Sequence, residues 1–150
     1  MDGPRNSLAI ALFSEILAVD QMIRNRLAKV LPKGMELSHF SVLNHLARSG
    51  AERTPAQLAQ TFHVTRGAMT NTLSKLEWAG YVHIRPDWDD ARRKMVAISP
   101  AGRKARDAAL SAVAPLFAGI VDEITEEKVR AMLPVLRELR STLDEDRREG

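Results

Sequence analysis

Apolar residues in the first third of the chain recur at steps of three and four, which is the spacing of one face of an amphipathic helix. This pattern predicts a long helix from Ser7 to Leu31, ended by Pro32-Lys33-Gly34. A second helix is predicted to begin at the N-cap Ser38 and to close at Gly50. Each helix has an apolar face and therefore needs a packing partner.

Two shorter helices follow, joined by a tight turn. Thr54-Pro55 combines a capping hydroxyl with a proline at the first helical position. His63-Val64 turns the chain, and Thr65 caps the next helix, from Arg66 to Ala79. A short connection between two short helices is typical of a helix-turn-helix.

The predicted helix 66–79 has two different faces. At 100° per residue, Met69, Leu73 and Leu76 cluster on one side. The opposite side is small and polar, and consists of Gly67, Thr70, Asn71 and Ser74, with Arg66 and Lys75 at its margins. A solvated face is the simpler interpretation, but such faces usually carry more Glu and Lys, which favour helices. Small polar residues instead let a helix approach DNA closely and bind phosphates or base edges.

Residues 81–85 and 95–99 alternate apolar and polar positions in the period of a β-strand, which predicts a hairpin. Its connection, residues 86–94, is longer and more charged than a minimal turn. From Arg85 to Arg106 the chain has seven basic and three acidic residues, so positive charge concentrates here. The basic candidates of the hairpin are Arg85, Arg92, Arg93 and Lys94.

Two more helices are predicted in the C-terminal third. One begins at Ser99-Pro100, and Pro115 is expected to kink or break it because the ring removes a backbone hydrogen bond. Thr125 caps the last helix, which Pro134 is expected to bend. The final residues, 144–150, are expected to fray.

The long helices at the two ends of the chain predict a dimer interface. The last helix keeps a 3-4-3-4 rhythm of apolar residues, which is the spacing of a coiled-coil seam. The residues predicted for the interface are Leu12, Ile16, Val129, Met132, Leu136, Leu139 and Leu143. The alternative is that both helices pack on their own domain, although a domain of this size has little else to cover two such stripes.

Composition limits the class of protein. The 150 residues suit one domain, and 45% hydrophobic with 27% charged residues is ordinary for a globular protein. The absence of cysteine excludes disulfides, thiolate metal sites and thiol redox sensing. No uninterrupted apolar run approaches the ~20 residues of a membrane span and no secretion signal is evident, so a cytoplasmic location is expected. A net charge of +3 and a pI near 9.6 favour a polyanionic partner.

Three motifs occur in a fixed order: Leu76-Glu77-Trp78-Ala79-Gly80-Tyr81-Val82 followed by Arg85, then Asp90-Ala91-Arg92, then Val96-Ala97-Ile98-Ser99-Pro100-Ala101-Gly102. In this order they resemble MarR-type transcriptional regulators, the multiple-antibiotic-resistance regulator family, over nearly the whole chain. The resemblance implies a single mainly α domain with a small β-hairpin wing. Its winged helix-turn-helix lobe would span about 36–99, and its dimerisation helices about 7–31 and 100–146. It also implies a homodimer that places each recognition helix in the major groove of double-stranded DNA and each wing over the adjacent minor groove.

The resemblance assigns roles to individual residues. The recognition positions are Thr65, Arg66, Gly67, Thr70 and Asn71, to which the polar helix face adds Ser74 and Lys75. In the wing, Asp90 would brace Arg92, which enters the minor groove, and Arg93 and Lys94 would contact phosphates.

Three residues depart from the family pattern. Asn71 stands where many members have arginine, and asparagine favours adenine if it reaches a base edge. Ala91 replaces a common basic residue, and Trp88 is unusual at the wing tip. We expect Trp88 to pack against the wing, with the sugar–phosphate surface as the alternative.

Other chemistry has less support from the residues. His39, His45, His63 and His83 lack metal-ligand spacing, and no catalytic motif accompanies them, so we expect no metal, no cofactor and no enzyme activity. The resemblance implies a phenolic or carboxylate effector, with a pocket predicted from Phe13, Leu17, His39, Leu43 and Phe117, each of which has plain core packing as the alternative. The sequence thus predicts a dimeric repressor of a pseudo-palindromic operator. The alternative is a winged-helix module that docks a protein partner.

Overall fold

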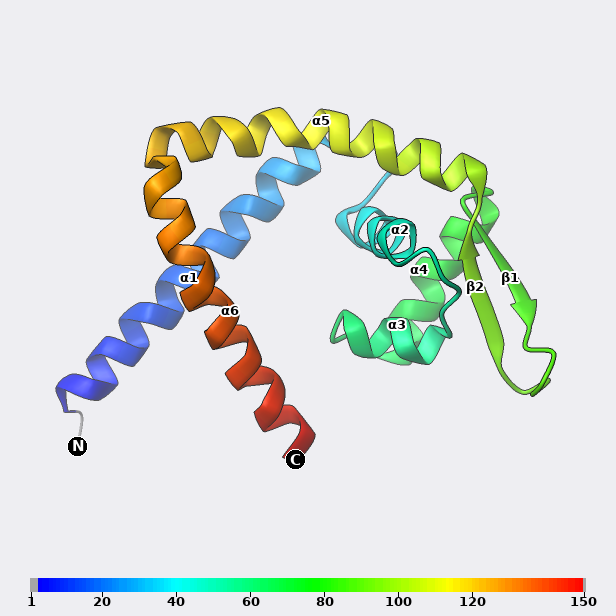
Figure 1. Cartoon of the computed structure of the whole chain (residues 1–150), viewed down its shortest axis with the longest axis horizontal. Coiled ribbons are helices and arrows are strands. Elements are labelled where there is room, and N and C mark those ends of the chain that lie inside the picture. Colours follow the sequence, from blue (N-terminus) through cyan, green and yellow to red (C-terminus); the bar gives the residue numbers. More distant parts are fainter. Residues whose placement is uncertain (1–2, 150) are drawn as a thin grey trace. The chain divides into compact units, whose positions relative to one another are not determined.

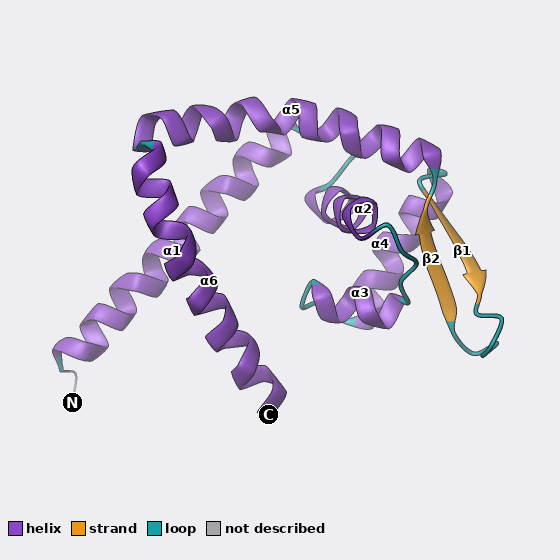
Figure 2. Ribbon diagram, in the orientation of Figure 1, coloured by secondary structure: helices purple, strands orange, loops and turns teal. Residues whose placement is uncertain are grey.

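The computed structural model describes the backbone of residues 3–149 and the side chains of residues 3–145. Over these residues the chain forms six helices and one two-stranded antiparallel sheet, as the sequence predicts (Figures 1 and 2). The elements are α1 (Pro4–Val30), α2 (Leu37–Ser49), α3 (Pro55–Thr61), α4 (Arg66–Trp78), β1 (Val82–Pro86), β2 (Lys94–Ile98), α5 (Pro100–Ile124) and α6 (Glu126–Glu149). The chain divides after Val113 into two compact units, so that α5 contributes to both.

The core of the first unit lies between α2, α3, α4 and the hairpin. Its buried residues form one cluster, and burying each large side chain contributes roughly 1.5–3 kcal/mol. The members are Val42, Leu43, Leu46, Leu58, Ala59, Met69, Leu73, Leu76, Val82 and Val96. The apolar face predicted for α4 is therefore confirmed as the face that packs into the core.

Both helices of the helix-turn-helix begin at the predicted caps. The Thr54 hydroxyl accepts a hydrogen bond from the Gln57 N–H at 3.1 Å, and Gln57 Oε1 accepts one from the Thr54 N–H at 2.9 Å. The Thr65 hydroxyl accepts a hydrogen bond from the Ala68 N–H at 3.1 Å. Between the helices His63 takes a φ of 54°, a left-handed conformation that keeps the turn short.

The start of α2 differs from the prediction, because its N-cap is Glu36 and Ser38 lies inside the helix. The Glu36 side chain accepts a hydrogen bond from the backbone N–H of His39, and the Glu36 N–H donates to His39 Nδ1 at 3.1 Å. This reciprocal pair satisfies two backbone donors, whereas a serine cap satisfies one. The sequence pattern of hydroxyl caps does not include such a pair.

The hairpin is confirmed, with its strand ends shifted by one residue. β1 and β2 pair from Val82 opposite Ile98 to Pro86 opposite Lys94. Arg53 adds an isolated bridge to Val96 through two backbone hydrogen bonds of 3.0 and 2.8 Å. The segment before α3 thereby attaches the hairpin to the helix-turn-helix.

Ser99 attaches the hairpin to both α4 and α5. Its N–H donates to the Tyr81 carbonyl at 2.9 Å, and its hydroxyl donates to the Gly80 carbonyl at 2.6 Å and accepts from the Gly102 N–H at 2.9 Å. Gly102 is required here because a Cβ would lie 2.0 Å from the Tyr81 carbonyl oxygen.

Only the C-terminal end of α1 is buried within the first unit. Leu27 and Leu31 pack with Ala109 and Val113 of α5 in a second buried cluster. Most other apolar residues of α1 are exposed, namely Leu8, Ile10, Leu12, Phe13, Leu17, Val19, Met22 and Ile23.

The length and mean hydropathy of α1 are also those of a helix able to cross a membrane. The sequence-based expectation rested on uninterrupted apolar runs, and α1 is interrupted by Glu15 and Asp20. By composition, its exposed face therefore fits either a membrane or another protein surface.

The two helical prolines do not end their helices. α5 continues through Pro115, which corrects the expected break, and α6 continues through Pro134. A proline removes one backbone hydrogen bond, but the bonds on both sides of it can still form in helices of this length. The backbone of α6 remains helical to Glu149, so the expected fraying is wrong over that range, and Gly150 lies outside the described residues.

Replacing Gly102 with alanine is expected to lower the free energy of unfolding by about 1–3 kcal/mol, because the Tyr81 carbonyl must move to admit the methyl group. Gly67 in α4 is the control. No atom lies within 4 Å of the position that a Cβ at Gly67 would take, so Gly67→Ala should cost nothing or stabilise by up to about 1 kcal/mol. Urea unfolding followed by circular dichroism measures both. Equal midpoints for Gly102→Ala and the parent protein would contradict the close packing.

Candidate nucleic-acid interface

The polar face of α4 is exposed along its whole length. The buried side chains of Met69, Leu73 and Leu76 fix the helix on the core, which leaves the opposite face to solvent. Every residue predicted to read DNA is exposed, namely Thr65, Arg66, Gly67, Thr70, Asn71, Ser74 and Lys75. Between its two basic residues, Arg66 and Lys75, the face carries small polar side chains, so a nucleic-acid surface can approach it closely.

A groove of about 670 Å³ separates α4 from the hairpin. It brings together Arg66, Thr70 and Ser74 of α4 with four basic residues of the wing. Its lining consists of Thr54, Pro55, Ala56, Arg66, Thr70, Leu73, Ser74, Glu77, Ile84, Arg85, Pro86, Arg92, Arg93 and Lys94. Thr65, Gly67, Asn71, Lys75 and Asp90 do not line it.

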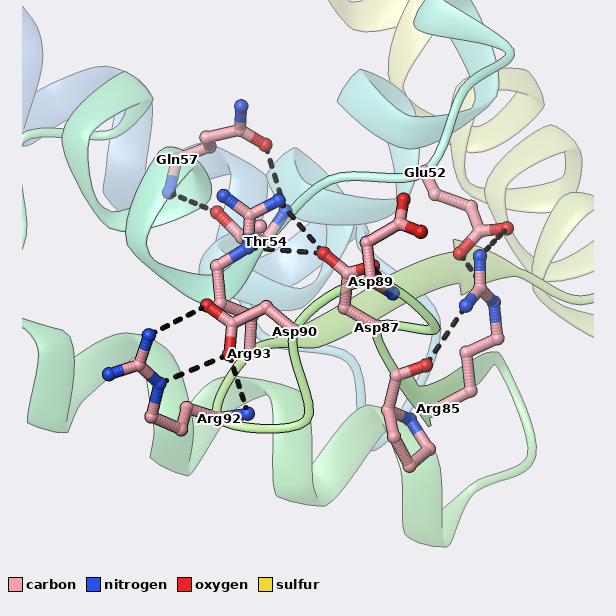
Figure 3. A network of polar contacts seen from close by, with 10 residues as sticks. Glu52, Thr54, Gln57, Arg85, Asp87, Asp89, Asp90, Arg92 and Arg93 are labelled. Atoms are coloured by element: carbon pink, nitrogen blue, oxygen red, sulfur yellow. Dashed lines mark hydrogen bonds and ion pairs between the residues drawn. The ribbon is translucent and has the colours of Figure 1, made fainter.

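The wing loop, which we define as residues 87–93, is closed by its own hydrogen bonds. The Asp87 N–H donates to the Arg93 carbonyl and the Arg93 N–H donates to the Asp90 carbonyl, both at 2.9 Å. The Arg93 guanidinium also contacts Asp87 Oδ2, with an Nη2–Oδ2 distance of 2.8 Å (Figure 3). The Asp89 N–H and the Arg93 guanidinium hold the pKa of Asp87 below its ordinary value, so the carboxylate stays ionised and the loop stays closed.

The contact expected between Asp90 and Arg92 is present. Asp90 Oδ1 accepts hydrogen bonds from the Arg92 N–H at 3.0 Å and from Arg92 Nε at 3.1 Å (Figure 3). Asp90 therefore holds one edge of the Arg92 guanidinium, while the side chain as a whole is 92% exposed. Its position is suited to a narrow polyanionic groove.

Arg85 differs from the other wing cations because all three nitrogens of its guanidinium contact acceptors outside the wing loop. Nε lies 3.0 Å from Glu52 Oε2, Nη2 lies 3.1 Å from Glu52 Oε1, and Nη1 donates to the Pro86 carbonyl at 2.9 Å (Figure 3). The ion pair is half-buried on both sides. No sequence pattern indicates Glu52, since it lies 33 residues from Arg85 and only the Arg53–Val96 bridge places it beside the hairpin.

Trp88 contacts the wing as expected, through Arg85 of β1, but the side chain is 81% exposed. Its one described ring contact is the Arg85 guanidinium carbon, 5.1 Å from the ring centroid. This distance suits a cation–π interaction.

A second cavity, of about 460 Å³, lies on the other side of α4, between the α1–α2 connection, α2 and α5. His39 is the one predicted effector residue that lines it, together with Lys33, Lys75 and Tyr81. Leu43 is fully buried in the core, and Phe13, Leu17 and Phe117 are exposed. Of the predicted effector residues within the first unit, His39 alone lines this cavity, and Phe117 belongs to the second unit.

Among the described residues, no three His, Asp or Glu side chains lie close enough to hold a metal ion. His45 contacts Phe62 edge to face with ring centroids 5.6 Å apart, and His39 is engaged in the α2 cap. Both have structural roles.

An exposed polar helix face beside a hairpin that presents four basic side chains is typical of a winged helix-turn-helix protein, a class that reads DNA. Residues 33–93 match the family model described as the MarR family. Over this segment the chain carries the sequence pattern of the MarR family, and its fold resembles that of solved MarR-type regulators.

Known proteins are similar to this chain over most of its length. A curated relative from Bacillus subtilis strain 168, the uncharacterized HTH-type transcriptional regulator YdgG, is 27% identical over 133 residues and aligns with 78% of this chain and 88% of its own length. A mutant of MarR from E. coli, solved in complex with operator DNA, is 25% identical, with a TM-score of 0.79 over 91% of this chain and 98% of that one. The organohalide-sensing regulator RdhR, in its 2,4-dichlorophenol-bound form, has the same fold, with a TM-score of 0.81 at 21% identity over 91% of this chain and 82% of that one.

Stability is expected to fall as the pH drops below about 6.5, because His39 must stay neutral to accept the Glu36 N–H. Burial lowers the pKa of His39, Glu36 opposes this and Lys75 adds to it. As the pH falls, His39 therefore takes up a proton in the unfolded chain before it does so in the folded chain. The contribution of His39 to the free energy of unfolding is complete above pH 6.5 and is lost between pH 6.5 and the lowered pKa of the folded state. The loss is at most about 1.4 kcal/mol per pH unit.

His39→Gln is the informative variant, because glutamine can complete the same reciprocal cap without titrating, as Gln57 does in α3. Its denaturation midpoint should change less between pH 7 and 5 than that of the parent protein. His83→Gln, at an exposed strand position, is the control. A parent protein and a His39→Gln variant with parallel pH profiles would contradict the role of His39.

Proposed function

We propose that the protein is a dimeric transcriptional repressor of a pseudo-palindromic DNA operator. The observation that carries the proposal is the groove between α4 and the wing, where polar residues of the helix face four basic residues. Repression requires only that the protein occupies a promoter, and it needs no further activating surface. A module that docks a protein partner would not need small polar residues along α4.

In this proposal α4 lies in the major groove and discriminates bases. Arg66, Thr70 and Asn71 are long enough or suitably placed to reach base edges, while Gly67 permits close approach. Thr65 at the N-cap, Ser74 within the polar face and Lys75 at its margin are exposed and suit phosphates.

The wing supplies contacts to the minor groove and the backbone. Arg92 projects into the minor groove, braced by Asp90, and Arg93 and Lys94 bind the flanking phosphates. Arg85 has the least freedom to reach a phosphate, because Glu52 and the Pro86 carbonyl already occupy its donors.

The dimer is proposed from the apolar residues that α1 and α6 expose. Leu12 of α1 is 48% exposed, and Met132, Leu136 and Leu143 of α6 are 45%, 43% and 52% exposed. Ile16, Val129 and Leu139, also predicted for the interface, are partly exposed. Apolar stripes of this extent are stabilised when a second copy covers them.

A membrane is the other surface that α1 fits by composition. Glu15 and Asp20 lie within its apolar stretch, and ionised carboxylates are costly in the bilayer interior. We therefore propose a protein surface as the partner of α1 and the cytoplasm as the location.

A small anionic effector is a second element of the proposal. The 460 Å³ cavity has the volume of a site for a small molecule, and Lys33 and Lys75 favour a phenolate or carboxylate. RdhR was solved with 2,4-dichlorophenol bound. Because the cavity contacts α4, a ligand there would bias the position of the recognition helix. In a dimer, Phe13 and Leu17, which α1 exposes, remain candidates for completing its walls.

Incubation with fragmented genomic DNA, followed by recovery and sequencing of retained fragments, tests the proposal. We expect enrichment of a palindrome whose half-sites lie about 10 bp apart, one helical turn, as a two-fold dimer requires. Asn71→Ala should still enrich the palindrome but relax preference at one base pair in each half-site. A lone half-site would contradict the dimer, and no enrichment would favour the docking module.

Arg92→Ala is expected to weaken operator binding by about 1–3 kcal/mol, or roughly five- to 150-fold, and to make the decrease of affinity with salt shallower. Fluorescence anisotropy across a salt series measures both quantities. Arg24→Ala is matched in charge and also removes an exposed arginine paired with an aspartate, but on α1, and should change affinity less than about twofold. Equal losses in the two variants would argue against a specific role for Arg92.

A further inference from the structure

Trp88 is an exposed indole held on a rigid support. The Arg85 guanidinium lies over its ring, and Arg85 is itself held by Glu52 and by the Pro86 carbonyl. One ring face is therefore covered by a fixed group, while the side chain as a whole is 81% exposed. Because Glu52 balances the charge of Arg85, the support brings no net charge to the ring.

The two flanks of the wing loop carry different side chains. Figure 3 shows Arg92 on one flank and Arg85 on the other, with Asp87 and Arg93 between them. Because the Arg85 guanidinium carbon lies 5.1 Å from the Trp88 ring centroid, we place the indole on the same flank as Arg85. The backbone bonds that close the loop fix this arrangement before any partner binds.

The surroundings of Trp88 favour nucleic acid over a protein partner. Apart from Ala91, its neighbours in residues 87–93 are all charged, so the indole is not the centre of an apolar patch. Two of the three aspartates are paired with Arg92 and Arg93 and repel phosphates less. DNA offers apolar deoxyribose surface between phosphates, which suits a single aromatic face among paired charges.

We propose that Trp88 is a DNA contact of the wing, resting on the function proposed above. Its free face packs on the deoxyribose ridge that borders the minor groove, on the flank opposite Arg92. This contact is uncharged, so it adds affinity without adding to the salt dependence. It also sets the depth of the wing in the groove, because the indole meets the ridge while the arginine enters.

Binding to a labelled duplex that carries the recovered palindrome tests the contact. Trp88→Ala should weaken binding about tenfold, and Trp88→Phe should weaken it less because a ring remains. Unlike Arg92→Ala, both should keep the salt slope of the parent protein. Trp78→Ala removes a tryptophan that is 93% exposed at the C-terminal end of α4, and should change affinity less than about twofold.

The chain has two tryptophans, so their fluorescence separates the sites. In Trp78→Phe, where Trp88 is the only reporter, the duplex should protect the indole from acrylamide quenching. In Trp88→Phe, where Trp78 reports, quenching should not change. Thermal unfolding of Trp88→Ala should match the parent protein because the side chain is exposed.

The outcomes distinguish this contact from the function on which it rests. If the parent protein binds the duplex and Arg92→Ala weakens it, but Trp88→Ala binds within twofold and Trp88 remains accessible to acrylamide, the contact is refuted and the function stands. If the parent protein enriches no DNA, both are refuted. A tenfold loss accompanied by a shallower salt slope would also contradict an uncharged contact.

Discussion

The hydrogen bonds of Ser99 hold the wing beside the recognition helix. A two-stranded hairpin is marginally stable by itself, so its position depends on attachments outside the ladder. Ser99 binds the carbonyls of Gly80 and Tyr81, where α4 gives way to β1, and its hydroxyl accepts a hydrogen bond from the Gly102 N–H in the first turn of α5. With the Arg53–Val96 bridge on the opposite edge, the hairpin is fixed on two sides. These bonds therefore fix the distance between α4 and the wing, and with it the width of the groove between them.

In the proposed function, α4 and the wing have different roles in recognising DNA. The α4 face has few charges and is anchored by buried Met69, Leu73 and Leu76, so its chemistry is suited to discrimination between bases. The wing has charge, but much of that charge is engaged within the loop: Asp87 holds Arg93 and Asp90 holds Arg92. These pairs are exposed, and exposed pairs contribute little to stability. Their effect is to limit the conformations of side chains that would otherwise lose freedom on binding.

The sequence predicted those features that depend on residues close together in the chain. The caps at Thr54 and Thr65, the buried face of α4 and the hairpin were all predicted because each requires only spacing and residue type. The cap at Glu36 was missed because its partner is a histidine rather than Glu or Gln. The Glu52–Arg85 pair depends on a tertiary bridge that no local pattern encodes. The effector residues were harder still, because a cavity is defined by several elements at once.

If the protein binds an operator as proposed, the paired charges of the wing affect its search along DNA. Around the loop, four basic side chains are matched by four acidic ones: Arg85, Arg92, Arg93 and Lys94 against Glu52, Asp87, Asp89 and Asp90. Attraction to random sequence depends mainly on unbalanced positive charge, so this hairpin holds the protein only weakly at sites it does not fit. Faster dissociation from such sites leaves more molecules free to find the operator. Selectivity then depends on rapid dissociation from nonspecific DNA as much as on tight binding to the operator.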